Sequence, residues 1–270
     1  MSDQPRTPSA DSVDDLRHAQ PNSLLAVLRI RDFRHLWIGL GLSSLGDWIG
    51  LLALTAMANQ IAGEASGGSY AVQNFAIAGV LFLRVLPALV MGPIAGWIAD
   101  RVDRRFTLVW GDYLRGALFL TIPIVGTLWW VFVVTVLIEM ISLVWLPAKD
   151  ASIPNLVPRH RLEAANQISL ATTYGSALPA AALFTGLTLL DNVYRQVFAQ
   201  IPIGPIDVAL YFNGISFVVS GLVIATLHEI PRGPAAQGGD SNAFRVILDG
   251  WKYVGGTPIV RGLVIGIVGA

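Results

Sequence analysis

The sequence lacks cysteine and has few charged residues. None of its 270 residues is a cysteine, which excludes disulfides and thiol chemistry and leaves the cellular compartment open. Charged residues make up 13% of the chain, whereas soluble domains carry about 25%. The net charge at pH 7 is zero, so nothing indicates a nucleic-acid partner. The charge deficit argues against a soluble enzyme.

Motifs of soluble catalysis are missing as well. The four histidines are scattered, without the H-E-x-x-H spacing of zinc hydrolases. There is no G-K-S/T phosphate loop, and the stretch "GLGLSSLG" misses the spacing of the dinucleotide-binding fingerprint. The sequence therefore predicts no catalytic residue, no metal site and no cofactor.

Long hydrophobic runs are what the sequence does contain. Hydrophobic residues make up 54% of the chain, and its mean hydropathy is +0.60. A bilayer core of about 30 Å needs roughly 20 apolar residues as helix. Six runs meet this need, at 36–60, 74–98, 106–126, 129–146, 166–190 and 208–227, and a seventh begins near Ile259 and is cut off at Ala270. The runs do not alternate as barrel strands do, so helices are predicted.

Basic residues between these runs predict the orientation. They cluster before the first run and after the second, fourth and sixth, whereas the alternate connections hold only Arg195. Cytoplasmic loops of membrane proteins carry an excess of Lys and Arg. We therefore expect a multi-pass protein of the cell inner or plasma membrane, with a cytoplasmic N-terminus.

These features divide the chain into four parts. Residues 1–22 are polar and lack the apolar core of a signal peptide, which predicts a disordered cytoplasmic tail. Residues 23–228 form the predicted six-helix bundle, and 23–37 is expected to lie at the membrane surface as a short amphipathic helix. A Gly- and Pro-rich cytoplasmic linker, 229–257, precedes the truncated start of a seventh helix, 258–270.

One charged loop carries a family resemblance. The stretch "GWIADRVDRR", residues 96–105, resembles the loop signature G-x-x-x-D-R-x-G-R-R of the major facilitator superfamily. Asp103 stands where that pattern usually has Gly, a form similar to the exporter branch that includes siderophore and macrolide efflux proteins. The stretches "FRHLWIGLGLSSLGDWIG", "PAKDASIPNLVPRHRLEAANQIS" and "ILDGWKYVGGTPIVRGL" resemble that branch's first span, its loop between spans four and five, and its entry to span seven.

The resemblance implies an all-α membrane protein. The family has two six-helix halves, each built from two inverted three-helix repeats, and works by alternating access around a central cavity. This chain would be the N-terminal six-helix bundle, with the C-terminal half of the same polypeptide missing. The resemblance also implies a cytoplasmic gate loop made of Gly96, Asp100, Arg101, Arg104 and Arg105. In it, Asp100 would contact the other half; the alternative is that these charges only anchor the topology.

Five ionisable residues fall within or near the predicted spans. A charge in a bilayer costs about 2.5–3.5 kcal/mol, so such residues face the bundle and have partners. Asp47 and Glu139 lie mid-span and are candidates for proton coupling at a cavity, with Arg84 beside them; a structural ion pair with Arg84 or Arg115 is the alternative. Asp112 and Arg115 are three residues apart, hence on one helix face. We associate them with the gate loop rather than with substrate.

Two functions fit these observations. The first is secondary active, proton-coupled efflux of a small amphipathic molecule of the drug or siderophore type. Its partners would be the lipid bilayer, the substrate and protons. The alternative is the membrane domain of a larger fusion protein with a cytoplasmic thymidylate-kinase-like enzyme, because some similar chains carry such a domain. The intramembrane acids favour the exporter, since an anchor has no use for costly buried charges.

Overall fold

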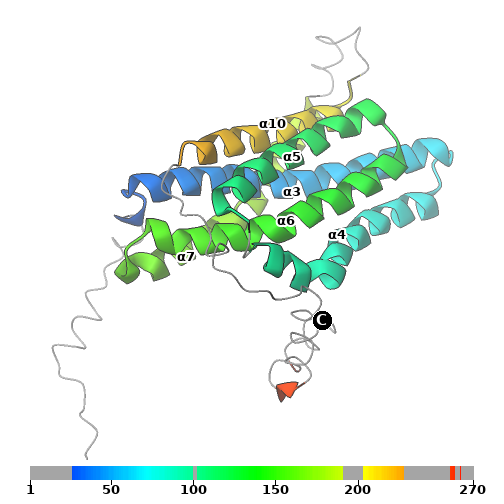
Figure 1. The fold of residues 1–270 in the computed structure, drawn as a ribbon. Coiled ribbons are helices and arrows are strands. Elements are labelled where there is room, and N and C mark those ends of the chain that lie inside the picture. Colours follow the sequence, from blue (N-terminus) through cyan, green and yellow to red (C-terminus); the bar gives the residue numbers. More distant parts are fainter. Residues whose placement is uncertain (1–25, 100–101, 191–202, 228–255, 259–261, 263–270) are drawn as a thin grey trace, which may run out of the picture.

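The computed structural model describes residues 26–99, 102–190, 203–227, 256–258 and 262. In these residues the regular elements are helices: α3 (Arg31–Ala65), α4 (Tyr70–Ala99), α5 (Arg104–Val125), α6 (Leu128–Leu156), the 3₁₀ turn η1 (Arg159–Arg161), α7 (Leu162–Gly175), α8 (Ala177–Leu189) and α10 (Pro205–Ala225). The long helices lie side by side as a bundle, with α10 along α5 and α4 along α6 (Figure 1). The predicted all-α fold is confirmed. The predicted tail, and almost all of the linker and seventh helix, lie outside the described residues.

Five helices are long and apolar enough to cross a membrane, by length and composition: α3, α4 over Tyr70–Gly92, α5, α6 and α10. The remaining predicted span, 166–190, is two helices rather than one, because α7 ends at Gly175 and α8 begins at Ala177. Pro179 explains the break. It has no N–H to donate to the carbonyl of Gly175, and its ring crowds that carbonyl.

Two predicted boundaries are wrong. Helix α6 continues ten residues past the predicted end at position 146, through Pro147 and Pro154. The added turns bury apolar side chains such as Ile153 and Leu156, and Ser152 Oγ donates to the Ala148 carbonyl at 2.7 Å. This burial outweighs the backbone hydrogen bonds that the two prolines remove. At the other boundary, α3 begins at Arg31, so residues 31–37 of the predicted surface helix 23–37 are part of the first long helix.

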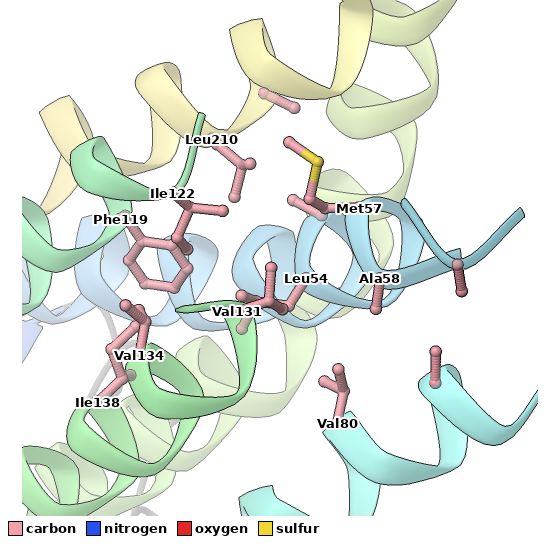
Figure 2. Packing of buried hydrophobic residues seen from close by; sticks show 14 of the residues in the cluster. Leu54, Met57, Ala58, Val80, Phe119, Ile122, Val131, Val134, Ile138 and Leu210 are labelled. Atoms are coloured by element: carbon pink, nitrogen blue, oxygen red, sulfur yellow. The ribbon is translucent and has the colours of Figure 1, made fainter. Parts of the chain in front are cut away.

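Two apolar clusters fill the bundle, one on each side of a polar layer. The first joins the start of α3, the start of α5 and the ends of α6 and α10; its members include Phe33, Leu36, Leu40, Leu108, Trp145, Ile153, Leu156 and Ile224. The second lies beyond the layer; its members include Leu54, Met57, Val80, Phe119, Ile122, Val131, Val134, Ile138, Leu210 and Phe217. Figure 2 shows side chains of the second cluster pointing toward one another from α3, α5, α6 and α10. The functional candidates lie between the clusters.

Helices α5 and α10 approach each other closely at two glycines. A Cβ added to Gly116 would lie 2.8 Å from the carbonyl oxygen of Gly214, and one added to Gly214 would lie 3.0 Å from the Gly116 carbonyl oxygen. Small residues at helix contacts are typical of membrane bundles, where packing stands in for the hydrophobic effect. The contact brings α10 against the face of α5 that carries the polar layer.

Candidate substrate pocket and its charged layer

Arg115 of α5 is the centre of the polar layer. Arg115 is fully buried. Its Nη1 lies 3.3 Å from Asp47 Oδ1 on α3, and its Nη2 forms an ion pair with Asp112, one turn earlier on α5. Nη2 also donates to Ser43 Oγ at 3.0 Å, and Nη1 donates to Ser142 Oγ at 3.4 Å. One guanidinium therefore serves two carboxylates and links α3, α5 and α6.

Aromatic rings hold the same guanidinium in place. The ring centroids of Trp145 on α6 and Phe217 on α10 lie 4.6 Å and 4.5 Å from Arg115 Cζ, within the range of cation–π attraction. Its partner Asp112 is fixed as well. That carboxylate accepts hydrogen bonds from Ser220 Oγ at 2.6 Å and Ser43 Oγ at 3.4 Å. Arg115 and Asp112 thus form a rigid, solvent-excluded unit.

A second ion pair joins α4 and α6. Arg84 Nε lies 3.0 Å from Glu139 Oε1, and the side chains are 29% and 20% exposed. The pair is therefore half-buried, unlike Arg115–Asp112. The Asp47 side chain is 36% exposed. Glu139 and Asp47 are therefore the two acids of this layer that are partly exposed.

These groups line one pocket of about 220 Å³. Its charged lining consists of Asp47, Arg84, Arg115, Glu139 and Lys149, and its apolar lining includes Leu40, Trp48, Trp145 and Leu146. Ser44, Ser142 and Thr173 complete it, so α3, α4, α5, α6 and α7 all contribute. The pocket can hold a small molecule that has both charged and apolar parts.

Two buried polar atoms on lining residues have no protein partner. Arg115 Nε and Thr173 Oγ1 make no hydrogen bond to any residue that the structure describes. Buried polar atoms are normally satisfied by protein, ordered water or ligand.

The described part of the predicted gate loop ties three helices together. Asp103 caps α5, since its carboxylate accepts from the Phe106 N–H at 3.0 Å. Arg104 Nη1 donates to the Ala151 carbonyl of α6 at 3.0 Å, and Arg105 Nη2 donates to the Ala225 carbonyl of α10 at 2.6 Å. The cap gives a local reason for an Asp where the family pattern has Gly, since Asp is a strongly preferred N-cap residue.

The remaining residues of the predicted gate loop are Gly96, Asp100 and Arg101. Asp100 and Arg101 lie outside the described residues, and Gly96 lies in the last turn of α4. For Asp112 and Arg115, the partners given above come from the polar layer. Their predicted association with the gate loop stays a prediction.

Sequence reasoning placed Asp47, Arg84 and Glu139 at a cavity, and the structure brings them together at this pocket. Arg115, which sequence reasoning associated with the gate loop, lines the same pocket. Sequence reasoning missed Ser142, Thr173 and Lys149, which also line it. A signal for two of them was present: Glu139, Ser142 and Lys149 are spaced by three and seven residues, which places them on one helix face. Thr173 comes from the divided α7–α8 segment and carries no such signal.

The fold and the pocket define a class of protein. Antiparallel apolar helices with ion pairs at mid-depth around a small pocket are typical of membrane transporters. Residues 22–182 match the family described as transmembrane secretion effector. The chain belongs to this family of the major facilitator superfamily, and it is a multi-pass membrane protein.

Relatives are named as transporters. The chain is similar to "Uncharacterized MFS-type transporter YfiS" of Bacillus subtilis, with 31% identity over 129 residues, 47% of this chain and 29% of the relative. It is also similar to "Putative bacilysin exporter BacE" of Bacillus subtilis, with 27% identity over 225 residues, 82% of this chain and 50% of the relative. The chain thus spans half or less of the length of these relatives, and their names agree with a transporter rather than an enzyme.

Acidic and histidine side chains do not gather for metal binding in the described part of the chain. No group of three or more such residues is placed there to hold an ion. The contacts that the structure shows at this site are ion pairs, hydrogen bonds and cation–π contacts.

Proposed function

We propose that the chain forms the N-terminal half of a secondary exporter that expels a small amphipathic molecule by alternating access and couples this to protons. The supporting observation is the pocket of about 220 Å³ in which Asp47 and Glu139 face the space and each contacts an arginine. Charges at this depth are costly and are kept for function. This supports transport over a plain membrane anchor for a fused kinase.

Asp47 and Asp112 share one cation, Arg115, and this supports Asp47 as a proton site. Two carboxylates contact one guanidinium, so the trio carries an excess negative charge. Asp112 is fully buried and held by serines, whereas Asp47 is exposed to the pocket. A proton on Asp47 would leave the Arg115–Asp112 pair intact, which lets Asp47 change charge without stranding a buried cation.

Mixed lining supports an amphipathic substrate. Trp48, Trp145 and Leu146 offer apolar surface beside the ion pairs. The resemblance adds the drug and siderophore types, and one relative bears the name of a bacilysin exporter. We propose a substrate that combines an apolar body with polar or charged groups.

The same proposal covers orientation and gating. The basic loops support a cytoplasmic N-terminus in the cell inner or plasma membrane. The gate loop would then face the cytoplasm, and Asp100 would contact the C-terminal half of the same polypeptide. Arg104 and Arg105 hold the described end of that loop on α6 and α10.

Transport by the complete protein tests the proposal. Inverted membrane vesicles would be loaded by a pH gradient with ethidium or carboxyfluorescein, a cationic and an anionic dye. Asp47→Asn and Glu139→Gln should each lower gradient-driven uptake by about tenfold or more, which is about 1.4 kcal/mol of lost coupling. Glu64→Gln is the matched control, because Glu64 is an exposed acid at the end of α3. Wild-type uptake and wild-type pH dependence in both pocket variants would contradict proton coupling through these acids.

A further inference from the structure

Lys149 is a buried cation at one end of the pocket. Its side chain is only 6% exposed, and it lines the pocket from the last three turns of α6. In the sequence it follows "LPA" directly. From its place after the fourth apolar run alone, Lys149 would be taken for one of the basic residues that set the membrane topology. Burial of an ammonium group is costly unless acceptors satisfy it.

The carboxylates that line the pocket contact its two arginines and not Lys149. Glu139 contacts Arg84, and Asp47 contacts Arg115. Lys149 contacts Asp150 at 2.9 Å, but Asp150 is 62% exposed and is not part of the pocket lining. Among the described residues, Lys149 is therefore the pocket cation whose carboxylate partner lies outside the pocket.

The Lys149 ammonium has more N–H donors than acceptors among the described residues. A lysine donates up to three hydrogen bonds, and the described residues supply the one acceptor at Asp150. An exposed carboxylate that water also solvates is a weak partner. An anionic group that enters the pocket can replace it at low cost.

Distance along α6 separates this cation from the other charges. Lys149 is seven residues from Ser142, which contacts Arg115, and ten residues from Glu139. At 1.5 Å per residue these spacings are about 10 Å and about 15 Å. Trp145 and Leu146 line the pocket between these levels and provide apolar surface.

We infer that Lys149 is an anion subsite that binds a carboxylate of the transported molecule, whose apolar body lies along Trp145 and Leu146. This rests on the proposed function and narrows its substrate to amphipathic molecules with an acidic group. In the proposed orientation the end of α6 is cytoplasmic, so Lys149 meets the substrate where it enters. Lys149 acts in recognition, and the proton-coupling acids lie deeper.

Binding of a matched probe pair tests the inference. The complete protein, purified in a neutral detergent, would be titrated with 4-phenylbutyrate and with 4-phenylbutyramide, which share the same apolar body. Intrinsic tryptophan fluorescence reports binding, since Trp145 and Trp48 line the pocket. Wild type should bind the carboxylate about tenfold or more tightly than the amide, as expected for a charge-assisted hydrogen bond.

Variants assign the preference to Lys149. Lys149→Gln should bring the two affinities within about twofold, Lys149→Arg should keep most of the preference, and Asp150→Asn should keep all of it, because the cation remains. Equal affinities in wild type, or no binding of the carboxylate, would overturn the inference even if Lys149→Gln failed to fold. An unchanged preference in folded Lys149→Gln would overturn it as well.

The outcome is separable from that of the proposed function. If the carboxylate preference is missing but the pH gradient still drives dye uptake, the anion subsite is wrong and the exporter stands. If the preference depends on Lys149 but no gradient drives uptake, the exporter is wrong and the subsite stands.

Discussion

Arg115 shows how one residue can have a structural and a functional side. On one side it is held by Asp112, Ser43 and Phe217, which are all buried. Toward the pocket it meets Asp47, whose side chain is 36% exposed. The buried side fixes the cation, and the open side faces the carboxylate that we propose as a proton site.

Removing this cation should destabilise the bundle more than removing the other pocket arginine. Arg115→Met would strand the Asp112 carboxylate in a dry site, and breaking a buried pair in this way costs about 3–5 kcal/mol. Arg84→Met should cost clearly less, because both members of that pair are partly exposed. Thermal unfolding of the purified complete protein measures both. Equal losses in the two variants would contradict the division into a buried and an open pair.

At the scale of elements, α5 and α10 depend on a contact without side chains. Gly116→Ala would place a methyl group 2.8 Å from the backbone oxygen of Gly214, which cannot rotate away. We expect a loss of about 1–3 kcal/mol, as for other overpacked sites, and a lower yield of folded protein. Gly186→Ala in α8 is the control, because its Cβ would meet nothing within 4 Å. A Gly116→Ala protein as stable as the Gly186→Ala protein would mean that the helices are farther apart than described.

Hydropathy located the long helices because each needs a continuous apolar run, and α4, α5 and α10 lie within a few residues of their predicted ranges. It failed where tertiary burial overrides a local signal. Pro147 and Pro154 indicate an ended helix, yet α6 continues through both. Pro179 does break its helix, one turn upstream. Single-residue signals gave no means of telling these prolines apart.

The site was only partly predictable for a related reason. Charges in apolar runs are visible in a sequence, so the acids and arginines were found. Their pairing depends on how far each helix extends along the bundle. Arg115 is eleven residues into α5 and Asp47 sixteen residues into α3, and only the packed structure shows that they meet.

At the scale of the molecule, orientation decides which side feeds the pocket. We expect Ala65→Cys, at the end of α3, to react with a membrane-impermeant maleimide in intact cells. His160→Cys, in η1 after α6, should react only after permeabilisation. Both positions are exposed, so the reagent can reach either once it is on the correct side. The opposite pattern would reverse the topology and place the gate loop outside.

Two apolar clusters enclose the charged layer from both ends, and this arrangement suits a half that rocks as a unit about a pocket. The first cluster holds the ends that carry Arg104 and Arg105, and the second holds the other ends of α3, α5 and α6. Alternating access requires that this pocket be reachable from each side of the membrane in turn.

Labelling of a single cysteine at the pocket tests that requirement most directly. These 270 residues contain no cysteine, so Ser142→Cys introduces their only thiol. In the complete protein the account predicts that an impermeant maleimide reaches position 142 from either face, and that an imposed pH gradient shifts reactivity from one face to the other. Leu137→Cys is the control on the same helix, because Leu137 lines an apolar groove outside the pocket and should react slowly from both faces. Reactivity of position 142 from one face only, whatever the gradient, would contradict alternating access through this pocket.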